Sequence, residues 1–139
     1  MLRTKNGDHN SYKSSDEVNN INWDALTADS DAWQMVHYYA ELISVRKNNP
    51  FIKEADQSFK LLDGNAIECT WSVTAADGGP TTLLGILILN PADEEMEYTL
   101  PEGPFILVLS SDPALQSGAA LDGTVTIPAK GAVFFVPGK

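Results

Sequence analysis

The chain has 139 residues, 43% of them hydrophobic and 20% charged, which is enough for one globular domain with its own core. Nine basic and nineteen acidic residues give a net charge of −10, so the chain repels a phosphate backbone and we expect no nucleic acid partner. The single cysteine, Cys69, excludes an internal disulfide and a cysteine-based zinc site, and no hydrophobic run approaches the roughly 18 residues that cross a membrane.

Residues 1 to about 28 are polar, rich in turn-forming Asn, Asp, Ser and Gly, and without the period of a helix or a strand. They nevertheless include Tyr12 and Trp23, which a repetitive flexible tail would lack. Arg3 and Lys5 make the N-terminus basic, but no apolar stretch follows them, so we expect no secretory signal. The compartment, bacterial cytoplasm or secreted, is left open.

Residues from about 30 to 48 are predicted to form one long helix. Ser30 or Asp31 is a suitable N-cap, and two basic residues occupy the last turn, where the helix dipole favours positive charge. Pro50 then prevents the helix from continuing. A surface helix needs one apolar stripe of about 100°, but this helix has two and requires covering on two sides. The stripes consist of Trp33, Val36, Ala40 and Ile43, and of Met35, Tyr39 and Leu42.

From about residue 55 onward the pattern is that of β-strands. Residues 66–75 alternate between apolar and polar side chains, and residues 82–90 are continuously apolar, as in a central strand that is covered on both faces. Further apolar runs are separated by turns rich in Gly and Pro, for a total of about seven strands. This pattern favours an antiparallel β-sandwich. Four side chains in these runs are predicted to be buried: Cys69, Trp71, Phe134 and Phe135.

The residues alone indicate no catalytic site. A nucleophilic triad would need His9 or His37 as its base, and we interpret the first as a solvated loop residue and the second as a partly buried packing residue. The acidic run 93–95 lies in a turn, where water solvates it rather than a pocket. The acidic residues between 8 and 16 lack EF-hand spacing, and no phosphate-binding loop or zinc motif occurs, so we predict no cofactor and no metal.

Two segments of the chain resemble a known family. Residues 3–23 follow the pattern RTK-x-G-x-x-NSY-x-x-x-D-x-x-N-x-x-x-W, and residues 38–50 follow YY-x-x-L-I-x-x-R-K-x-x-P. These motifs, followed by an antiparallel sandwich, resemble the end of the catalytic barrel of type I pullulanases, the starch-debranching enzymes of the α-amylase superfamily. The resemblance covers essentially the whole chain, although the sandwich is matched by architecture and position only. The sequence departs from the family at Asn6, where a Gly is common, and at Asn22, where an Asp usually precedes the Trp.

The resemblance implies a mainly β fold, an antiparallel β-sandwich of about seven strands preceded by one long helix and a polar N-terminal loop left over from a (β/α)₈ barrel. Residues 1–50 would be the loop after the eighth barrel strand and the eighth helix, and residues 51–139 the C-terminal sandwich domain. A sugar-facing loop at the barrel rim needs polar side chains with an aromatic platform, which explains the opening segment. Asp16 matches the family carboxylate that holds sugar hydroxyls. The positions that shape this loop are matched by Asn10, Tyr12 and Asn19.

We therefore predict a non-catalytic C-terminal region of a pullulanase-like glycoside hydrolase that acts on α-1,6 branch points of α-glucans. Because the family's three catalytic carboxylates lie on earlier barrel strands, the chain itself should be inactive, while its parent should be a retaining glycoside hydrolase. Its expected role is to pack on the missing barrel and to support a substrate-side loop.

Expectations about partners and two alternative functions accompany this prediction. We expect α-glucan to bind the chain weakly if at all. Without the barrel one helix stripe is uncovered, so we predict a homodimer through the helix and the opening segment. The alternative function is a stand-alone carbohydrate-binding β-sandwich module, which usually carries exposed aromatic side chains. An unrelated structural sandwich is disfavoured by the length of the motifs.

Overall fold

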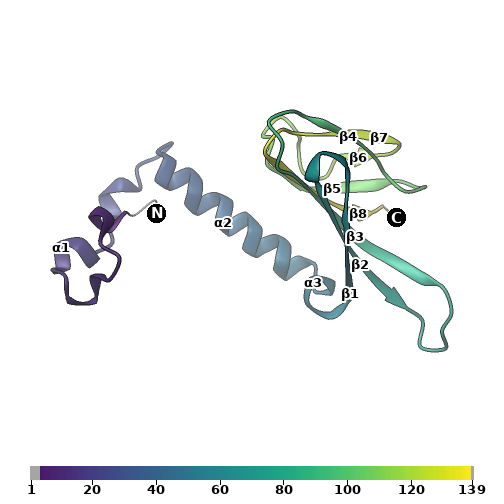
Figure 1. Ribbon diagram of the computed structural model, residues 1–139, viewed down its shortest axis with the longest axis horizontal. Helices are drawn as coiled ribbons and strands as arrows, with labels where there is room; N and C mark the ends of the chain where they lie inside the picture. The colour runs from purple at the N-terminus through teal and green to yellow at the C-terminus, as the bar shows by residue number, and fades with distance from the viewer. Residues whose placement is uncertain (1–3, 139) are drawn as a thin grey trace. The chain divides into compact units, whose positions relative to one another are not determined.

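A computed structural model describes residues 4–138 of the chain. The chain divides into two compact units, the first ending at Asn48 and the second beginning at Asn49. Each unit is described by itself, with its elements labelled in Figure 1. None of the described helices combines the length and the hydropathy that a membrane span requires.

The first unit opens with four short helical turns where the sequence predicts irregular structure. Each turn has only three or four residues, which is too short for an apolar period to show in the sequence. The turns are η1 (Lys5–Gly7), η2 (Ser11–Lys13), α1 (Asp16–Asn19) and η3 (Trp23–Ala25).

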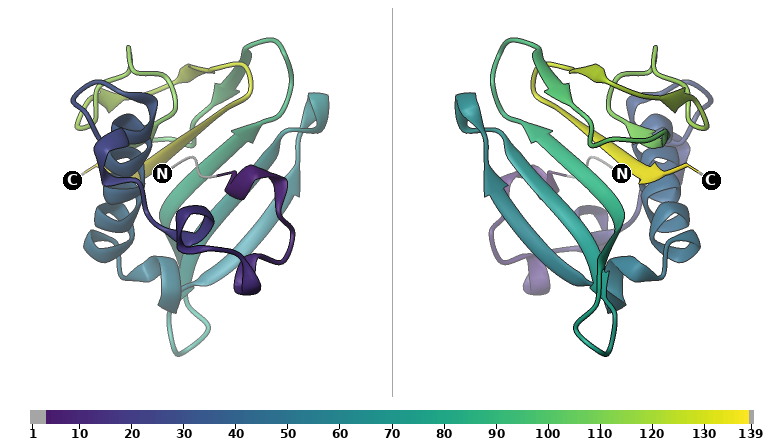
Figure 2. Two further views of the ribbon diagram at one scale, coloured as in Figure 1. Left: turned by 90° about the vertical axis from the view of Figure 1, so that its left-hand side faces the viewer. Right: turned by 90° about the vertical axis from the view of Figure 1, so that its right-hand side faces the viewer.

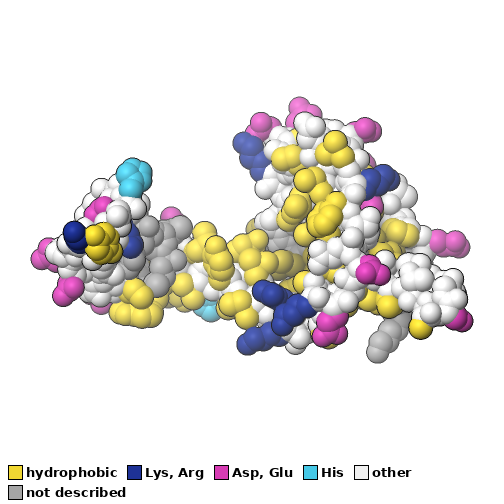
Figure 3. Space-filling view, turned by 60° about the horizontal axis from the view of Figure 1, so that its bottom comes forward, with side chains coloured by type: hydrophobic (Ala, Val, Ile, Leu, Met, Phe, Trp, Pro, Cys, Tyr) yellow, Lys and Arg dark blue, Asp and Glu magenta, His cyan; other side chains and the backbone are white. Residues whose placement is uncertain are grey.

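The long helix α2 spans Asp31–Asn48, within one residue of the predicted range. The Ser30 hydroxyl accepts a hydrogen bond from the backbone N–H of Trp33 at 3.1 Å, so Ser30 rather than Asp31 is the N-cap. The helix ends before Pro50, as the sequence predicts. Figure 3 shows hydrophobic side chains along much of the visible surface of α2.

The second unit begins with α3 (Phe51–Glu54), a single turn that the sequence does not reveal, and also contains the 3₁₀ turn η4 (Asp63–Asn65). Its strands form a six-stranded antiparallel sheet in the order β1-β2-β3-β8-β5-β6, and an antiparallel pair β4-β7. The predicted mainly β antiparallel fold is thereby confirmed (Figures 1 and 2). The strands are β1 (Asp56–Leu61), β2 (Ile67–Thr74), β3 (Thr81–Asn90), β4 (Met96–Thr99), β5 (Phe105–Ser110), β6 (Ala120–Leu121), β7 (Thr124–Ile127) and β8 (Gly131–Pro137).

The main core lies between one face of the large sheet and the β4-β7 pair. It joins side chains from β3, β5 and β8 to side chains from β4 and β7, so the two sheets form one sandwich core. We call this side of the large sheet the inner face. The core cluster consists of Ile86, Ile88, Tyr98, Leu100, Phe105, Leu107, Ile127, Val133 and Phe135.

Asn90 is a buried polar residue at the end of β3 that holds two turns together. Its Nδ2 donates to the carbonyl of Glu94 at 2.8 Å and to the carbonyl of Pro128 at 3.1 Å. Its Oδ1 accepts a hydrogen bond from the backbone N–H of Ala92 at 3.1 Å. The buried amide therefore finds partners for both of its polar atoms.

The opposite side of the large sheet, which we call the outer face, is covered at one place by α3. The Phe51 ring lies 6.4 Å from the ring of Trp71 and 6.4 Å from the ring of Phe134, centroid to centroid. Gly85 makes room for it, because a Cβ there would lie 2.9 Å from Cε2 of Phe51. Small size, rather than a left-handed backbone, is what this position requires.

The predicted buried residues are confirmed, with exposed fractions of 7% or less for Cys69, Trp71, Phe134 and Phe135. Burial also raises the pKa of the Cys69 thiol, which keeps the thiol protonated. The expectation that β3 is covered on both faces is wrong. Leu89 on this strand is 38% exposed, because no element of the second unit covers that part of the outer face.

Candidate functional site

Asn19 holds the opening segment together through its side chain. Its Nδ2 donates to the carbonyl of Ser11 at 2.7 Å and to the carbonyl of Ser14 at 3.2 Å. Its Oδ1 lies 3.4 Å from the ammonium of Lys5. These contacts tie together residues that are 5 to 14 positions apart in the sequence. Among residues 4–28, polar side-chain contacts rather than buried apolar side chains thus hold the segment together.

Lys5 supplies the second anchor of this segment. Its ammonium donates to the hydroxyl of Ser11 at 2.5 Å, and Ser11 is the buried residue of the segment, with 7% exposure. Asn6 adopts a φ of 53°, in the left-handed region of backbone space. Gly adopts this region without steric cost, and Asn adopts it more readily than most other residues. The departure from the family's Gly at this position therefore fits the backbone that the segment adopts.

Asp8 fixes the turn that contains Asn10. One of its carboxylate oxygens accepts a hydrogen bond from the backbone N–H of Asn10 at 2.9 Å, and the other accepts one from the hydroxyl of Ser14. These two hydrogen bonds, aided by the positive charge of Lys5, lower the pKa of Asp8 from its ordinary value. The carboxylate is thus a structural acceptor.

The four predicted site residues lie in this one segment but in two kinds of surroundings. Asp16 begins α1 and is exposed, as is Asn10. The Tyr12 ring is 72% exposed, with the ammonium of Lys13 5.3 Å from the ring centroid. Asn19 is half-buried and occupied by the backbone carbonyls described above. Three of the four side chains can therefore reach a ligand, whereas Asn19 shapes the segment.

Sequence reasoning missed the roles of Lys5, Asp8 and Ser11. Lys5 and Ser11 do fall within the RTK and NSY portions of the motif, but only the fold shows that they contact each other. At the end of the segment Asn22 accepts a hydrogen bond from the backbone N–H of Asp24 at 3.1 Å, which is the capping role that an Asp would also perform. This places the neighbouring Trp23 in an exposed position, at 65%.

The histidines and the remaining acidic residues add no catalytic cluster. His37 is exposed, not partly buried as predicted, and it packs against the Trp33 ring at 3.8 Å between centroids, because both side chains project from the same side of α2. Asp93, in the run 93–95, is exposed and pairs with Lys130 at 2.5 Å. Within residues 4–138, no three His, Cys, Asp or Glu side chains gather as a metal site would require.

Comparisons with known proteins identify relatives of this arrangement. No family model matches the chain. A pullulanase from Bacillus subtilis (strain 168) is 46% identical over 50 residues, which are 36% of this chain and 6% of that protein. The structure of pullulanase type I from the same strain, complexed with maltose, superimposes with a TM-score of 0.72 and 26% sequence identity. The match covers 99% of the residues of this chain and 20% of the residues of that pullulanase.

Two further solved structures agree with this match. The pullulanase from Bacillus acidopullulyticus matches 98% of this chain and 17% of its own, with 25% identity and a TM-score of 0.71. The pullulanase from Anoxybacillus sp. LM18-11, complexed with maltotetraose, has 22% identity and a TM-score of 0.71 and supports the fold alone. The chain therefore matches a region of pullulanases, glycoside hydrolases of the α-amylase family, and spans about a fifth of the solved relatives.

Proposed function

We propose that this chain is a non-catalytic C-terminal region of a pullulanase-like glycoside hydrolase that acts on α-1,6 branch points of α-glucans. The observation that carries the proposal is the match of 99% of the chain to a pullulanase type I complexed with maltose. In this proposal residues 1–50 are the end of the barrel and residues 51–139 are the sandwich domain. The chain packs on the catalytic barrel and supports a loop on the substrate side.

The geometry of the opening segment supports a role in holding sugar. Asp16 offers an exposed carboxylate for sugar hydroxyls, and Tyr12 offers an exposed ring for the C–H face of a sugar. The hydrogen bonds of Asn19 and Asp8 order this segment before any ligand arrives. Pre-ordering reduces the entropy that binding would otherwise lose.

The chemistry of cleavage is assigned to the rest of the parent chain. A retaining glycosidase needs an acid and a nucleophile placed on either side of the scissile bond, about 5 Å apart. In the proposal both carboxylates belong to the barrel, and the residues of this chain only bind and orient the glucan. Asp16 then contributes to substrate binding and not to proton transfer.

A chimera tests this function. The region of the Bacillus subtilis pullulanase that matches this chain is replaced by residues 1–139, and pullulan hydrolysis is measured. We expect the chimera to cleave pullulan and Asp16→Asn to lower kcat/KM by about ten-fold or more, the loss of a charge-assisted hydrogen bond. Asp24→Asn, an exposed acidic residue of the same segment, is the matched control and should leave kcat/KM unchanged. An inactive chimera, or equal effects of the two variants, would contradict the proposal.

The binding-module alternative retains one supporting observation. Tyr12 and Trp23 are exposed aromatic rings in the same polar segment, 72% and 65% respectively, as a sugar platform would be. Titration of the isolated chain with maltotetraose in a calorimeter separates the two functions. A submillimolar dissociation constant that is lost in Trp23→Ala would favour the module, whereas weak or absent binding favours the proposed region of a larger enzyme.

A further inference from the structure

Strand β1 leaves one edge of the large sheet without a partner strand. It stands first in the strand order β1-β2-β3-β8-β5-β6, and all six of its residues are exposed. The opposite edge of the sheet is β6, which has only two residues. An unpaired edge presents a row of backbone N–H and C=O groups that can pair with another strand. Within the described sheet, β1 is therefore the longer of the two open edges.

Most of the features by which proteins block an edge strand are missing from β1. Such features are a very short strand, a Pro, a β-bulge or a charged side chain. β1 has six residues without Pro, and its register with β2 runs from Asp56 to Leu61 without a shift. Its charged side chains are Asp56 and Lys60. Because their charges are opposite, they complement each other when one copy of β1 meets another in the antiparallel direction.

The ladder with β2 shows which backbone groups of β1 face the open edge. The backbone N–H of Leu62 donates to the carbonyl of Ala66 at 2.8 Å, and this pair continues the register of β1 with β2. Hydrogen-bonded pairs alternate along an antiparallel ladder, so the even-numbered residues of β1 direct their backbone groups to β2. The backbone groups of Gln57 and Phe59 therefore face away from β2, toward the open edge.

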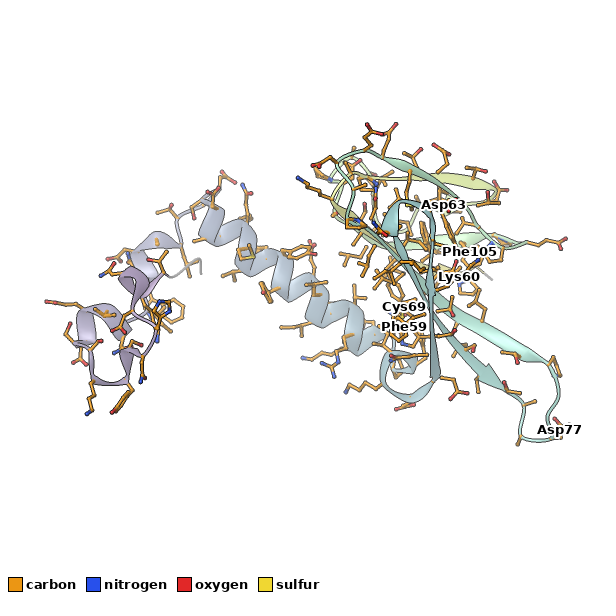
Figure 4. All side chains as sticks on the ribbon, viewed as in Figure 1. Phe59, Lys60, Asp63, Cys69, Asp77 and Phe105 are labelled. Carbon is orange, nitrogen blue, oxygen red and sulfur yellow. The ribbon has the colours of Figure 1, made fainter. Side chains whose placement is uncertain are left out.

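The side chains of β1 alternate between the two sides of the sheet. Figure 4 shows Phe59 and Lys60 projecting to opposite sides of the strand. The strand period of two places Asp56 and Ser58 on the same side as Lys60, which is the inner side. Within residues 4–138, neither Asp56 nor Lys60 forms a salt bridge. Both charges of the strand are therefore available to a partner at the edge.

We propose that β1 pairs edge to edge with β1 of a second copy of this chain, antiparallel about a two-fold axis beside Ser58. In this register Gln57 exchanges backbone hydrogen bonds with Phe59 of the second copy. Asp56 lies opposite Lys60 of the second copy, and the two-fold symmetry repeats this ion pair on the other side of the axis. Opposite charges directly across an antiparallel ladder stabilise the pairing.

Charge selects this register over its neighbour. The directions of the backbone groups also permit an axis beside Phe59, which would place Lys60 opposite Ser58 of the second copy. That axis removes the direct opposition of Asp56 and Lys60 and makes the two Lys60 side chains diagonal neighbours, which repel each other. The axis beside Ser58 instead makes the two Phe59 rings, each 68% exposed, diagonal neighbours on the outer side.

The proposed contact is small and stands apart from the proposed function. Two six-residue strands form less contact than a standard interface of about 1,600 Å². We therefore expect a weak, reversible pairing, which a covalent trap detects better than light scattering does. Edge pairing leaves both faces of the sheet free, so the failure of this inference would leave the function of the chain as proposed, and the reverse.

A disulfide trap tests the axis. The full chain carries Trp33→Ser and Ile43→Ser, to remove the predicted contact through α2, and either Ser58→Cys or Lys60→Cys. In oxidised glutathione, Ser58→Cys should form a covalent dimer at least ten-fold faster than Lys60→Cys. The two residues 58 form a non-hydrogen-bonded pair with Cα atoms about 4.5 Å apart, which a disulfide spans, whereas the two residues 60 are roughly 13 Å apart. The chain without either substitution should form none, because Cys69 is buried.

A charge swap tests the ion pairs. In the Ser58→Cys chain, Lys60→Asp alone or Asp56→Lys alone should slow dimer formation about five-fold, and the two together should restore the rate to within about two-fold. The first substitution makes the chain more negative and the second makes it less negative. General charge repulsion would therefore change the two rates in opposite directions, whereas loss of the specific pair lowers both.

Each outcome supports or overturns the pairing. Equal rates for Ser58→Cys and Lys60→Cys, opposite effects of the two single charge changes, or no recovery in the double change would overturn it. Faster linking in a mixture of Ser58→Cys and Lys60→Cys chains than in Ser58→Cys alone would move the axis to Phe59. The reduced variants should keep the thermal midpoint within about 2 °C, because these side chains are exposed. If Ser58→Cys lowers it further, a carbodiimide that joins a carboxylate to an amine replaces the disulfide, and the charge series decides.

Discussion

The hydroxyl of Tyr98 on β4 donates a hydrogen bond to Oε2 of Glu68 on β2 at 2.7 Å, so a side-chain hydrogen bond joins the two sheets in addition to the packing of their core. Burial is the main cause that raises the pKa of Tyr98, and the hydrogen bond and negative charge of Glu68 add to it. The neutral phenol is therefore the form that the folded protein holds.

Tyr98→Phe should lower the free energy of unfolding by about 1 kcal/mol, since it removes this hydrogen bond from a half-buried carboxylate. The pH dependence follows from the raised pKa. The folded pKa of Tyr98 exceeds the unfolded value of about 10, so its contribution is complete below pH 10 and is lost as the pH rises above it. In urea unfolding experiments between about pH 9 and pH 11, the free energy of unfolding should fall more steeply with pH in the wild type than in Tyr98→Phe. Parallel curves would contradict this, and Tyr39→Phe, which is exposed, serves as the control.

Gly85→Ala should destabilise the second unit by about 1–3 kcal/mol through overpacking. The new Cβ would lie 2.9 Å from Cε2 of Phe51 and 3.1 Å from Cε2 of Phe134. Phe51→Leu in the same chain should recover part of that loss, because the shorter side chain leaves space. A double-mutant cycle from chemical denaturation measures this coupling, and strict additivity would show that Phe51 does not occupy the hollow.

Asn19→Ala should loosen the opening segment without unfolding the second unit. The substitution removes the side-chain donor to the carbonyls of Ser11 and Ser14, although the Ser11 carbonyl still accepts a hydrogen bond from the backbone N–H of Ser14 at 3.0 Å. Proteolysis between residues 11 and 15 should become several-fold faster, while the thermal transition of the sheet is unchanged. Glu17→Ala, on the same short helix, is the control. Equal cleavage rates for the two variants would contradict the inference that the Asn19 side chain holds the segment together.

The isolated chain should release no reducing sugar from pullulan, starch or glycogen. The proposed function places the acid and the nucleophile in another part of the parent, and their absence removes most of the barrier lowering that a glycosidase provides. A sensitive reducing-end assay on purified chain checks this. Activity that survives purification and falls when a carboxylate of this chain is substituted would contradict it.

The isolated chain should also self-associate through α2. Its exposed side chains include Trp33 at 36%, Tyr39 at 59% and Ile43 at 53%, which leave an apolar surface in contact with water. Light scattering across a concentration series should show a dimer, and Ile43→Ser with Trp33→Ser should shift it toward monomer. A monomer at every concentration would rule out this contact.

The parts of the fold that could be predicted are those that depend on the sequence of a few neighbouring residues. Ser30 and Pro50 bound the long helix, and the alternation of residues 66–75 anticipates β2, because capping, proline geometry and the strand period act over a few residues. The single turn of α3 and the two residues of β6 are too short for such a period.

The candidate site is a prediction from the motif, and the contacts within its segment are visible only in the fold. The motif located Asp16 and Tyr12, whereas the contact between Lys5 and Ser11 depends on how an irregular segment folds back on itself. The exposure of Leu89 was missed for a related reason. An apolar side chain has the same sequence pattern whether its partner is in the same unit or absent from it.

The side chain of Asn90 has a consequence for the order in which the sandwich assembles. It bonds to the carbonyl of Pro128, 38 positions further along the chain, so this contact forms only after intervening strands have found their places. We therefore expect this contact to form after the folding transition state and to be complete only in the native state. Asn90→Ala should therefore raise the unfolding rate constant and leave the folding rate constant nearly unchanged. This one amide then helps to set the lifetime of the folded domain.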